Sequence, residues 1–237
     1  DKRSIFEQEV KCCEKNDLCY PKELKKIKDS PPILYYKGDI GILNQQKNIA
    51  VIGSRKISEN GIRLAYNAGK IIGKNGFNVV NGLALGCDAE ALKGALAAGG
   101  KCAVVLPCGI NEIYPKSNQW IAEEVLKQGG CLISEYPEGT RPEKYRFVQR
   151  DRLQSGMSQG VLVVEAMEKS GTMHTAEYAK KQNRRLACYY HGLLKYSTGN
   201  NVLENLYQAA VIKTNEDLEN YLCEIADIEE YTQLSFD

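Results

Sequence analysis

Short apolar runs alternate with longer amphipathic stretches along most of this chain. The run NIAVIG at 48–53 predicts a buried strand, and the stretch 58–75 after it predicts a helix with Ser58 as N-cap and Gly76 as its stop. The same alternation predicts further strands at 77–83, 101–106, 131–134, 160–165, 185–190 and 210–213, and further helices at 88–98, 117–128, 172–182 and 201–208. Strands that are apolar on both faces and separated by helices indicate an α/β fold, with a mostly parallel sheet and helices on both faces.

The same pattern divides the chain into three parts. Residues 1–45 form a lead-in with one short helix and one short strand, and residues 46–223 carry the regular alternation of strands and helices. We expect the lead-in to pack on this main domain. Residues 224–237 are expected to form an acidic C-terminal tail, because the chain has many acidic residues and no Lys or Arg from Glu216 onward.

Composition adds little that is specific. Of the 237 residues, 43% are hydrophobic and 26% are charged, which is ordinary for a globular protein. The formal net charge is +1, so the basic surface that a nucleic-acid-binding protein needs would have to come from clustering. No run reaches the roughly 18 apolar residues of a membrane span, and the polar start is not typical of a secretion signal, so no membrane partner is expected. The chain begins with Asp1 rather than Met, as a trimmed fragment would.

The nine cysteines include no Cys-x-x-Cys pair. Several lie in or beside apolar runs, which predicts buried free thiols in a reducing compartment and therefore a cytoplasmic protein; these are Cys87, Cys102, Cys108, Cys131 and Cys188. Zinc binding by the three N-terminal cysteines stays an alternative, although their spacing does not suit a closed tetrahedral site. We expect no metal and no cofactor.

Ligands of a parallel sheet bind outside the carboxyl ends of its strands, so the loops after the strands are the candidate binding segments. Gly53, Ser54 and Arg55 directly follow the first strand of the main domain. Gly53 lets the backbone approach a ligand, Ser54 offers a hydroxyl, and the Arg55 guanidinium suits phosphate oxygens. The alternative is a plain strand–helix turn with a surface arginine. The spacing is not Gly-x-Gly-x-x-Gly, so a dinucleotide site is poorly supported.

The loop after the second of these strands, NGLALGCD at 81–88, contains two glycines. Asp88 is expected either to cap the next helix or to contact a ligand. Lys93 lies one turn further on, where it would either reach a phosphate or only solubilise the helix.

A third candidate loop is RFVQRDRLQSGMS at 146–158, in which Phe147 lies among three arginines. This is typical of phosphate contacts beside a stacking surface for bases. The alternative is a solvated charged face with Phe147 in the core. Arg150 and Arg152 belong to this loop, and Asp151 between them would either weaken DNA binding or hold one arginine in an internal ion pair.

Residues Ser170, Gly171 and Thr172 enter a later helix and form a second candidate anion site. An enzyme would also need a poised acid, base or nucleophile. His174 is expected on a helix surface, and Glu165, at the end of a buried strand, is expected to pair with a nearby arginine. These residues favour a binding protein over an enzyme.

Seven segments, in this order, resemble the DprA/Smf family of DNA-processing proteins over roughly residues 20–213. Besides Tyr20-Pro21 with the Pro31-Pro32 strand, they are AVIGSR at 50–55, NGLALGCDAEALKGAL at 81–96, CGINEIYP at 108–115, GGCLISEYPEG at 129–139, FVQRDRLQSGMS at 147–158 and VLVVEAMEKSGTMHTAEYA at 161–179. The resemblance implies an extended Rossmann-like fold and a non-catalytic, dimeric protein. It also implies that the protein binds single-stranded DNA and loads it onto the RecA recombinase in natural transformation.

The resemblance further implies a positive pocket for the DNA backbone. Its expected members are Gly53, Ser54, Arg55, Phe147, Arg150 and Arg152, while Lys93, Ser170, Gly171 and Thr172 lie at matching places. Two alternatives stay open. One is a nucleotide-hydrolysing protein of the LOG or lysine-decarboxylase-like Rossmann group, although 169–175 lacks the second glycine and the glutamate of that group's motif. The other is a nucleotide-sensing domain.

Overall fold

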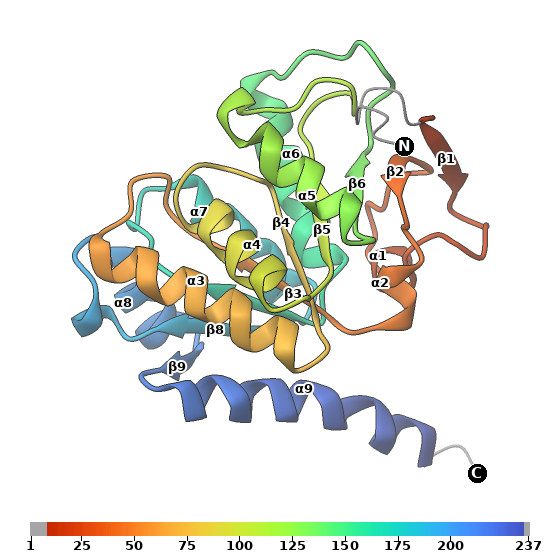
Figure 1. The fold of residues 1–237 in the computed structure, drawn as a ribbon. Coiled ribbons are helices and arrows are strands. Elements are labelled where there is room, and N and C mark those ends of the chain that lie inside the picture. Colours follow the sequence, from red (N-terminus) through yellow and green to blue (C-terminus); the bar gives the residue numbers. More distant parts are fainter. Residues whose placement is uncertain (1–8, 235–237) are drawn as a thin grey trace.

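A nine-stranded sheet runs through the part of the chain that the structure describes, residues 9–234 of this computed structural model (Figure 1). Its strands are β1 (Lys11–Glu14), β2 (Ile33–Gly38), β3 (Asn48–Ile52), β4 (Asn78–Asn81), β5 (Cys102–Val105), β6 (Cys131–Ser134), β7 (Gly160–Val163), β8 (Arg185–Tyr189) and β9 (Ala210–Ile212). They lie in the order β1-β2-β6-β5-β4-β3-β7-β8-β9. Predictions that fall on residues 1–8 and 235–237 lie outside the described residues.

All strands from β6 to β9 in this order run parallel, whereas β2 is antiparallel to β6 and β1 is antiparallel to β2. The chain proceeds from β3 outward to β6 and then returns to place β7 on the other side of β3. The strand order therefore reverses between β3 and β7. In open α/β sheets, the crevice at such a switch point is where ligands bind.

Helices cover both faces of the sheet, because successive residues of its central strands point to opposite faces and are apolar on both. Val51 and Val79 face one core, whereas Ala50 and Val80 face cores on the other side. The first face is covered by α3 (Glu59–Lys74), α4 (Cys87–Ala97), α5 (Gln119–Lys127) and α9 (Asn215–Leu234). The second is covered by α1 (Lys22–Lys25), α2 (Ile42–Gln45), α6 (Lys144–Gly156), α7 (Gly171–Lys181) and α8 (Thr198–Leu206). Figure 1 shows α3 and α4 side by side on their face, with α9 along its edge.

The α/β class, the mostly parallel sheet and the helices on both faces are confirmed. The start of α3 is also as predicted, because the Ser58 hydroxyl accepts a hydrogen bond from the Gly61 N–H at 3.1 Å. The predicted burial of the five cysteines beside apolar runs is confirmed as well. No helix within residues 9–234 has the length and apolar character needed to cross a membrane.

The prediction of a loop at 146–158 is wrong, because most of this stretch forms α6. Its inward-facing positions follow the helical period, but two of them are Arg150 and Gln154, beside the apolar Leu153 and Met157. Polar residues at buried positions conceal the apolar stripe by which a helix is recognised in a sequence. The helix matters for the site, because the helical period determines which of the arginines in this segment point to the same side.

The lead-in is joined to the main domain through the sheet itself. Strand β2 pairs with β6, and a buried ion pair joins Glu23 of the lead-in to Arg184 at 2.6 Å. At the other end of the chain, α9 extends without a break through Leu234, so the described part of the acidic tail continues this helix. The division into three parts stays a prediction.

Candidate functional site

A cavity of about 450 Å³ opens at the switch point between β3 and β7. Three predicted segments line it: the loop after β3, the middle of α6, and the start of α7. Eight of the ten predicted site residues lie on its wall, namely Gly53, Ser54, Arg55, Phe147, Arg150, Ser170, Gly171 and Thr172. The fold thus brings residues from distant parts of the chain to one place at the carboxyl ends of the strands.

The loop after β3 is fixed by its backbone. The Ser54 N–H donates to the Glu165 carbonyl at 2.7 Å, and the Ser54 carbonyl accepts from the Cys87 N–H at 3.2 Å. A Cβ atom at Gly53 would lie 2.3 Å from the Cys87 sulfur, so only glycine fits there. The structure therefore explains Gly53 by its packing against α4, and its contact with a ligand stays a prediction.

Phe147 presents a half-exposed ring with two guanidinium groups close to it. The guanidinium carbon of Arg55 lies 5.5 Å from the ring centroid and that of Arg150 lies 5.9 Å from it. The Tyr114 ring meets Phe147 edge-on, with centroids 5.4 Å apart. Arg55 is exposed and has no acidic partner within 4 Å among the described residues. We call Phe147 with Arg55 and Arg150 the Phe147 platform.

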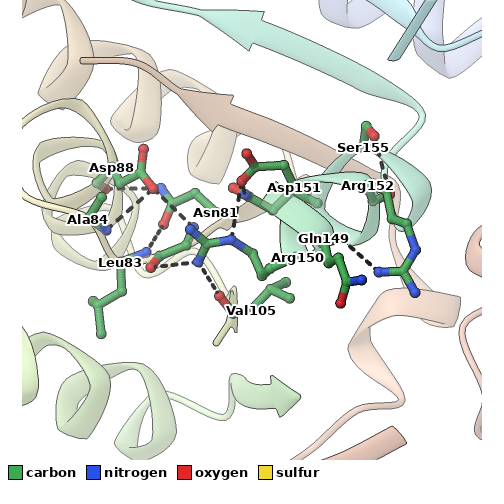
Figure 2. Close-up of polar contacts among 12 residues, drawn as sticks. Asn81, Leu83, Ala84, Asp88, Val105, Gln149, Arg150, Asp151, Arg152 and Ser155 are labelled. Carbon is green, nitrogen blue, oxygen red and sulfur yellow. Dashed lines mark hydrogen bonds and ion pairs between the residues drawn. The ribbon is translucent and has the colours of Figure 1, made fainter. Parts of the chain in front are cut away.

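The side chain of Arg150 is buried, and its guanidinium lies on the protein side of the Phe147 platform. Its Nη1 donates to the Gly82 carbonyl at 3.1 Å and to the Val105 carbonyl at 2.7 Å (Figure 2). Its Nε lies 3.4 Å from the Asp151 carboxylate. A Cβ atom at Gly82 would lie 2.1 Å from Nη1, so the guanidinium packs directly against the glycine backbone. Arg150 therefore joins α6 to the loop after β4 and to the end of β5.

Two buried carboxyl groups flank Arg150. Asp88 does not cap α4, where Gly86 is the N-cap; instead, its carboxylate accepts from the Gly82 N–H at 3.0 Å and holds the loop after β4. Burial raises the pKa of Asp88 and that of Asp151 to about 6 each, although the nearby Arg150 charge opposes this rise. The charge of the cavity floor therefore changes in mildly acidic solution.

The structure does not bring Arg152 to the cavity. Arg152 donates to both oxygens of Glu135 at 2.9 and 2.7 Å, and it lies 3.2 Å from the Asp29 carboxylate. Two residues apart on a helix lie about 200° apart around its axis, so Arg150 and Arg152 point in opposite directions (Figure 2). Of the two alternatives for Asp151, the structure shows the internal pairing, and the partner is Arg150.

Lys93 is also outside the cavity wall. Its ammonium pairs with Glu90, three residues earlier on α4, and both side chains are half-buried. The structure therefore gives Lys93 an ion-pairing role within this helix, and contact with a phosphate stays a prediction.

Helix α7 points its amino end at the cavity. Ser170 is the N-cap residue, but its hydroxyl donates to the Met167 carbonyl at 2.7 Å and does not cap the helix. The first N–H groups of a helix have no intrahelical partner, and they favour an anion together with the helix dipole. Gly171 and Thr172 thus line the cavity at the end of the helix that favours an anion, and the binding of an anion there stays a prediction.

Glu165 was expected to pair with an arginine, and this is wrong. Its fully buried carboxylate accepts from the Ser58 N–H at 2.8 Å on one oxygen and from the Tyr196 N–H at 2.8 Å on the other. The Lys195 N–H donates to the second oxygen at 3.2 Å. Backbone amides satisfy this carboxylate because the loops after β3 and β8 both turn toward the end of β7. His174 is exposed on α7, as predicted.

Sequence reasoning missed several residues of this region. Lys56 and Val148 line the cavity, and Tyr114 lies beside the Phe147 ring. Each had a signal: Lys56 directly follows Arg55, Val148 follows Phe147, and Tyr114 belongs to the segment CGINEIYP. Within residues 9–234, no three His, Cys, Asp or Glu side chains gather into a set of metal ligands.

Comparison with known proteins identifies the family and the fold. The family model described as DNA recombination-mediator protein A matches residues 11–222. Protein Smf of Synechocystis is 38% identical over 172 residues, which are 71% of this chain and 43% of that protein. The chain spans about half the length of the curated relatives it matches.

Two solved structures have the same fold over most of the chain. DNA processing protein A of Helicobacter pylori, for which a single-stranded DNA binding mode is described, superposes with a TM-score of 0.82 at 30% identity. The match covers 92% of this chain and 98% of that one. The protein of the same name from Streptococcus pneumoniae superposes with a TM-score of 0.77 at 31% identity, over 90% of this chain and 74% of that one.

Proposed function

The chain belongs to the DNA recombination-mediator protein A family, and from this premise we propose that it binds single-stranded DNA in the switch-point cavity without reacting with it. The observation that carries the proposal is the Phe147 platform. The half-exposed Phe147 ring offers a face for a base, and the exposed Arg55 guanidinium beside it offers charge for the adjoining phosphates. Base stacking of this kind tolerates every sequence, because each base has a π-face.

The start of α7 supports a second contact with the same ligand. Its free N–H groups face the cavity that holds the Phe147 platform, so a phosphate there would complete a short path for the DNA backbone. Arg55 and Lys56 line the same cavity as the start of α7. This arrangement suits an extended chain of phosphates and bases.

The carboxylates near the cavity support a binding role rather than catalysis. Glu165 is used by backbone donors, and Asp88 holds the loop after β4. Asp151 is paired with Arg150 and accepts from the Gln154 amide at 3.0 Å. A general base needs a carboxylate that can reach the proton it removes, and these three serve the loops and the helix around the cavity.

The family resemblance also motivates the wider role. We infer that the protein is a homodimer that passes single-stranded DNA to the RecA recombinase, in DNA processing and natural transformation. A pull-down of RecA with this chain, with and without an oligonucleotide, tests that role. RecA that stays unbound in both conditions contradicts it.

Fluorescence anisotropy with a labelled oligothymidylate tests the proposed function. We expect binding that weakens steeply as salt increases, because phosphate contacts release counterions. A thermal-shift series with mononucleotides runs beside it. A large shift with a mononucleotide and no binding of the oligonucleotide would replace the DNA proposal with a nucleotide-sensing or nucleotide-hydrolysing one.

A further inference from the structure

A second aromatic ring with two cationic neighbours lies beside the switch-point cavity. The Lys56 ammonium lies 5.0 Å from the centroid of the Tyr196 ring, and the Lys195 ammonium lies 5.5 Å from it. Both lysines are exposed, and among the described residues neither has an acidic partner within 4 Å. The ring itself is half-exposed. This is the chemistry of the Phe147 platform, repeated with lysines in place of arginines.

Lys56 connects the two sites. It lines the switch-point cavity beside Arg55, and its ammonium lies over Tyr196. Tyr196 and Lys195 line a second hollow of about 600 Å³, whose other wall is the start of α3. Glu59 adds one negative charge to that wall, whereas two lysines place two positive charges near the Tyr196 ring. A strand that leaves the Phe147 platform along the loop after β3 therefore meets Tyr196 next.

The buried carboxylate of Glu165 joins the loop that carries Lys56 to the loop that carries Tyr196. One oxygen holds the Ser58 N–H, at the end of the loop that carries Arg55 and Lys56. The other oxygen holds the N–H groups of Lys195 and Tyr196. The Glu165 carbonyl accepts from the Ser54 N–H in addition. One residue thus fixes both loops, so Tyr196 is held at a constant position relative to the cavity before any ligand binds.

We propose that Tyr196, with Lys56 and Lys195, is a second stacking platform for the same DNA strand, farther along the strand than the Phe147 platform. This inference rests on the proposed function. Stacking on a tyrosine ring and charge from two lysines require no particular base, so the second platform lengthens the site without adding sequence preference. Glu165 is the positioning residue that holds the loop of Arg55 and Lys56 to the loop of Lys195 and Tyr196.

Affinities for an oligothymidylate series from about 4 to about 16 nucleotides test the proposal in the full chain. For Tyr196→Ala, we expect a loss of roughly 5- to 100-fold with the longest oligonucleotides and no change with the shortest, which fill the first platform only. Tyr196→Phe keeps the ring, and no hydrogen bond of its hydroxyl exists among the described residues, so it should bind like the original chain.

Lys56→Ala and Lys180→Ala form a matched pair. Both lysines are exposed, and each ammonium lies 5.0 Å from a tyrosine ring, but the Lys180 ring is Tyr207, which lines neither cavity. We expect Lys56→Ala to weaken binding of long oligonucleotides and Lys180→Ala to leave it unchanged. The melting temperature of each variant shows whether it is folded.

The outcomes separate the two proposals. If Tyr196→Ala changes affinity equally at every length, or at none, while Arg55→Ala still weakens binding, the second platform is wrong and the proposed function stands. If Arg55→Ala also leaves binding unchanged, or if no oligonucleotide binds, the proposed function fails together with the second platform. Length-dependent loss that Tyr196→Phe does not show supports the proposal.

Discussion

The Arg55 guanidinium lies 5.5 Å from the centroid of the Phe147 ring, although one residue follows β3 and the other lies on α6. The contact combines an exposed cation with a half-exposed aromatic face at the point where the strand order reverses. A cation over an aromatic ring is attracted to its π-face, which orients the guanidinium before a phosphate arrives. Predictions about binding therefore begin with these two side chains.

Arg55→Ala should weaken binding of single-stranded DNA by roughly tenfold or more at low salt and leave the fold intact, since Arg55 is exposed. It should also make the slope of log K against log salt shallower by about 0.7, the value of one phosphate contact on a single strand. Anisotropy titrations at several salt concentrations measure both. Arg63→Ala is the matched control, because Arg63 is exposed on α3 and its guanidinium contacts Asn60. Equal effects of both variants would contradict a specific contact at Arg55.

Phe147→Ala should cost about 1–3 kcal/mol of binding free energy, the usual value of one stacked base. Phe147→Tyr keeps the aromatic face and should bind nearly as well as the original chain. Titrations with a short oligothymidylate, which fills one platform, give the clearest comparison. If Phe147→Ala binds as well as Phe147→Tyr, the ring only supports the two arginines and no base stacks on it.

How far the sequence predicts this molecule depends on the kind of feature. Runs such as 48–53 and 131–134 become β3 and β6, because a strand with apolar residues on both faces suits the middle of a covered sheet. Helix α6 was missed because Arg150 and Gln154 occupy its buried side. In both cases the sequence pattern predicts burial only for apolar residues. It does not predict the burial of a polar residue whose hydrogen bonds are satisfied inside the protein.

Some residues of the candidate site could also be predicted from the sequence, and others could not. Gly53, Ser54 and Arg55 could be predicted, because loops after parallel strands always meet at one edge of the sheet. Arg152 could not be separated from Arg150 until the helix fixed their phase. The place of Tyr196 depends on the Glu165 carboxylate, which joins loops that are far apart in the sequence. Such long-range hydrogen bonds have no local signal.

Arg152 and Arg150 should therefore respond differently to substitution. Arg152→Ala should lower the free energy of unfolding by about 1.5–3 kcal/mol, since the charged hydrogen bonds to Glu135 are lost, and should leave DNA affinity unchanged. Arg150→Ala should cost more, about 3–5 kcal/mol, because it leaves Asp88 and Asp151 buried without their cation. Chemical denaturation measures both. A folded Arg152→Ala that binds DNA poorly would place Arg152 in the interface after all.

The stability of the fold and its affinity for DNA should both depend on pH. Burial raises the pKa of Asp151 from 3.8 to about 6, so the native state binds more protons than the unfolded state between about pH 4 and pH 6. The same holds for Asp88, and protonation of both carboxyls therefore stabilises the fold as the pH falls through 6, a contribution that is lost as the pH rises again. Protonation also removes negative charge from the cavity wall, so DNA should bind more tightly at pH 5.5 than at pH 7.5.

Asp151→Asn separates this effect from general charge. It should tighten binding at pH 7.5 by about 1 kcal/mol, or roughly fivefold, because one negative charge beside a phosphate is removed. It should also flatten the pH profile in part, since Asp88 still titrates. Glu219→Gln removes an exposed carboxylate on α9 and is the control for net charge. If both variants shift affinity alike, or if the profile of Asp151→Asn keeps its full slope, the Asp151 carboxylate does not face the bound phosphates and serves only to hold Arg150.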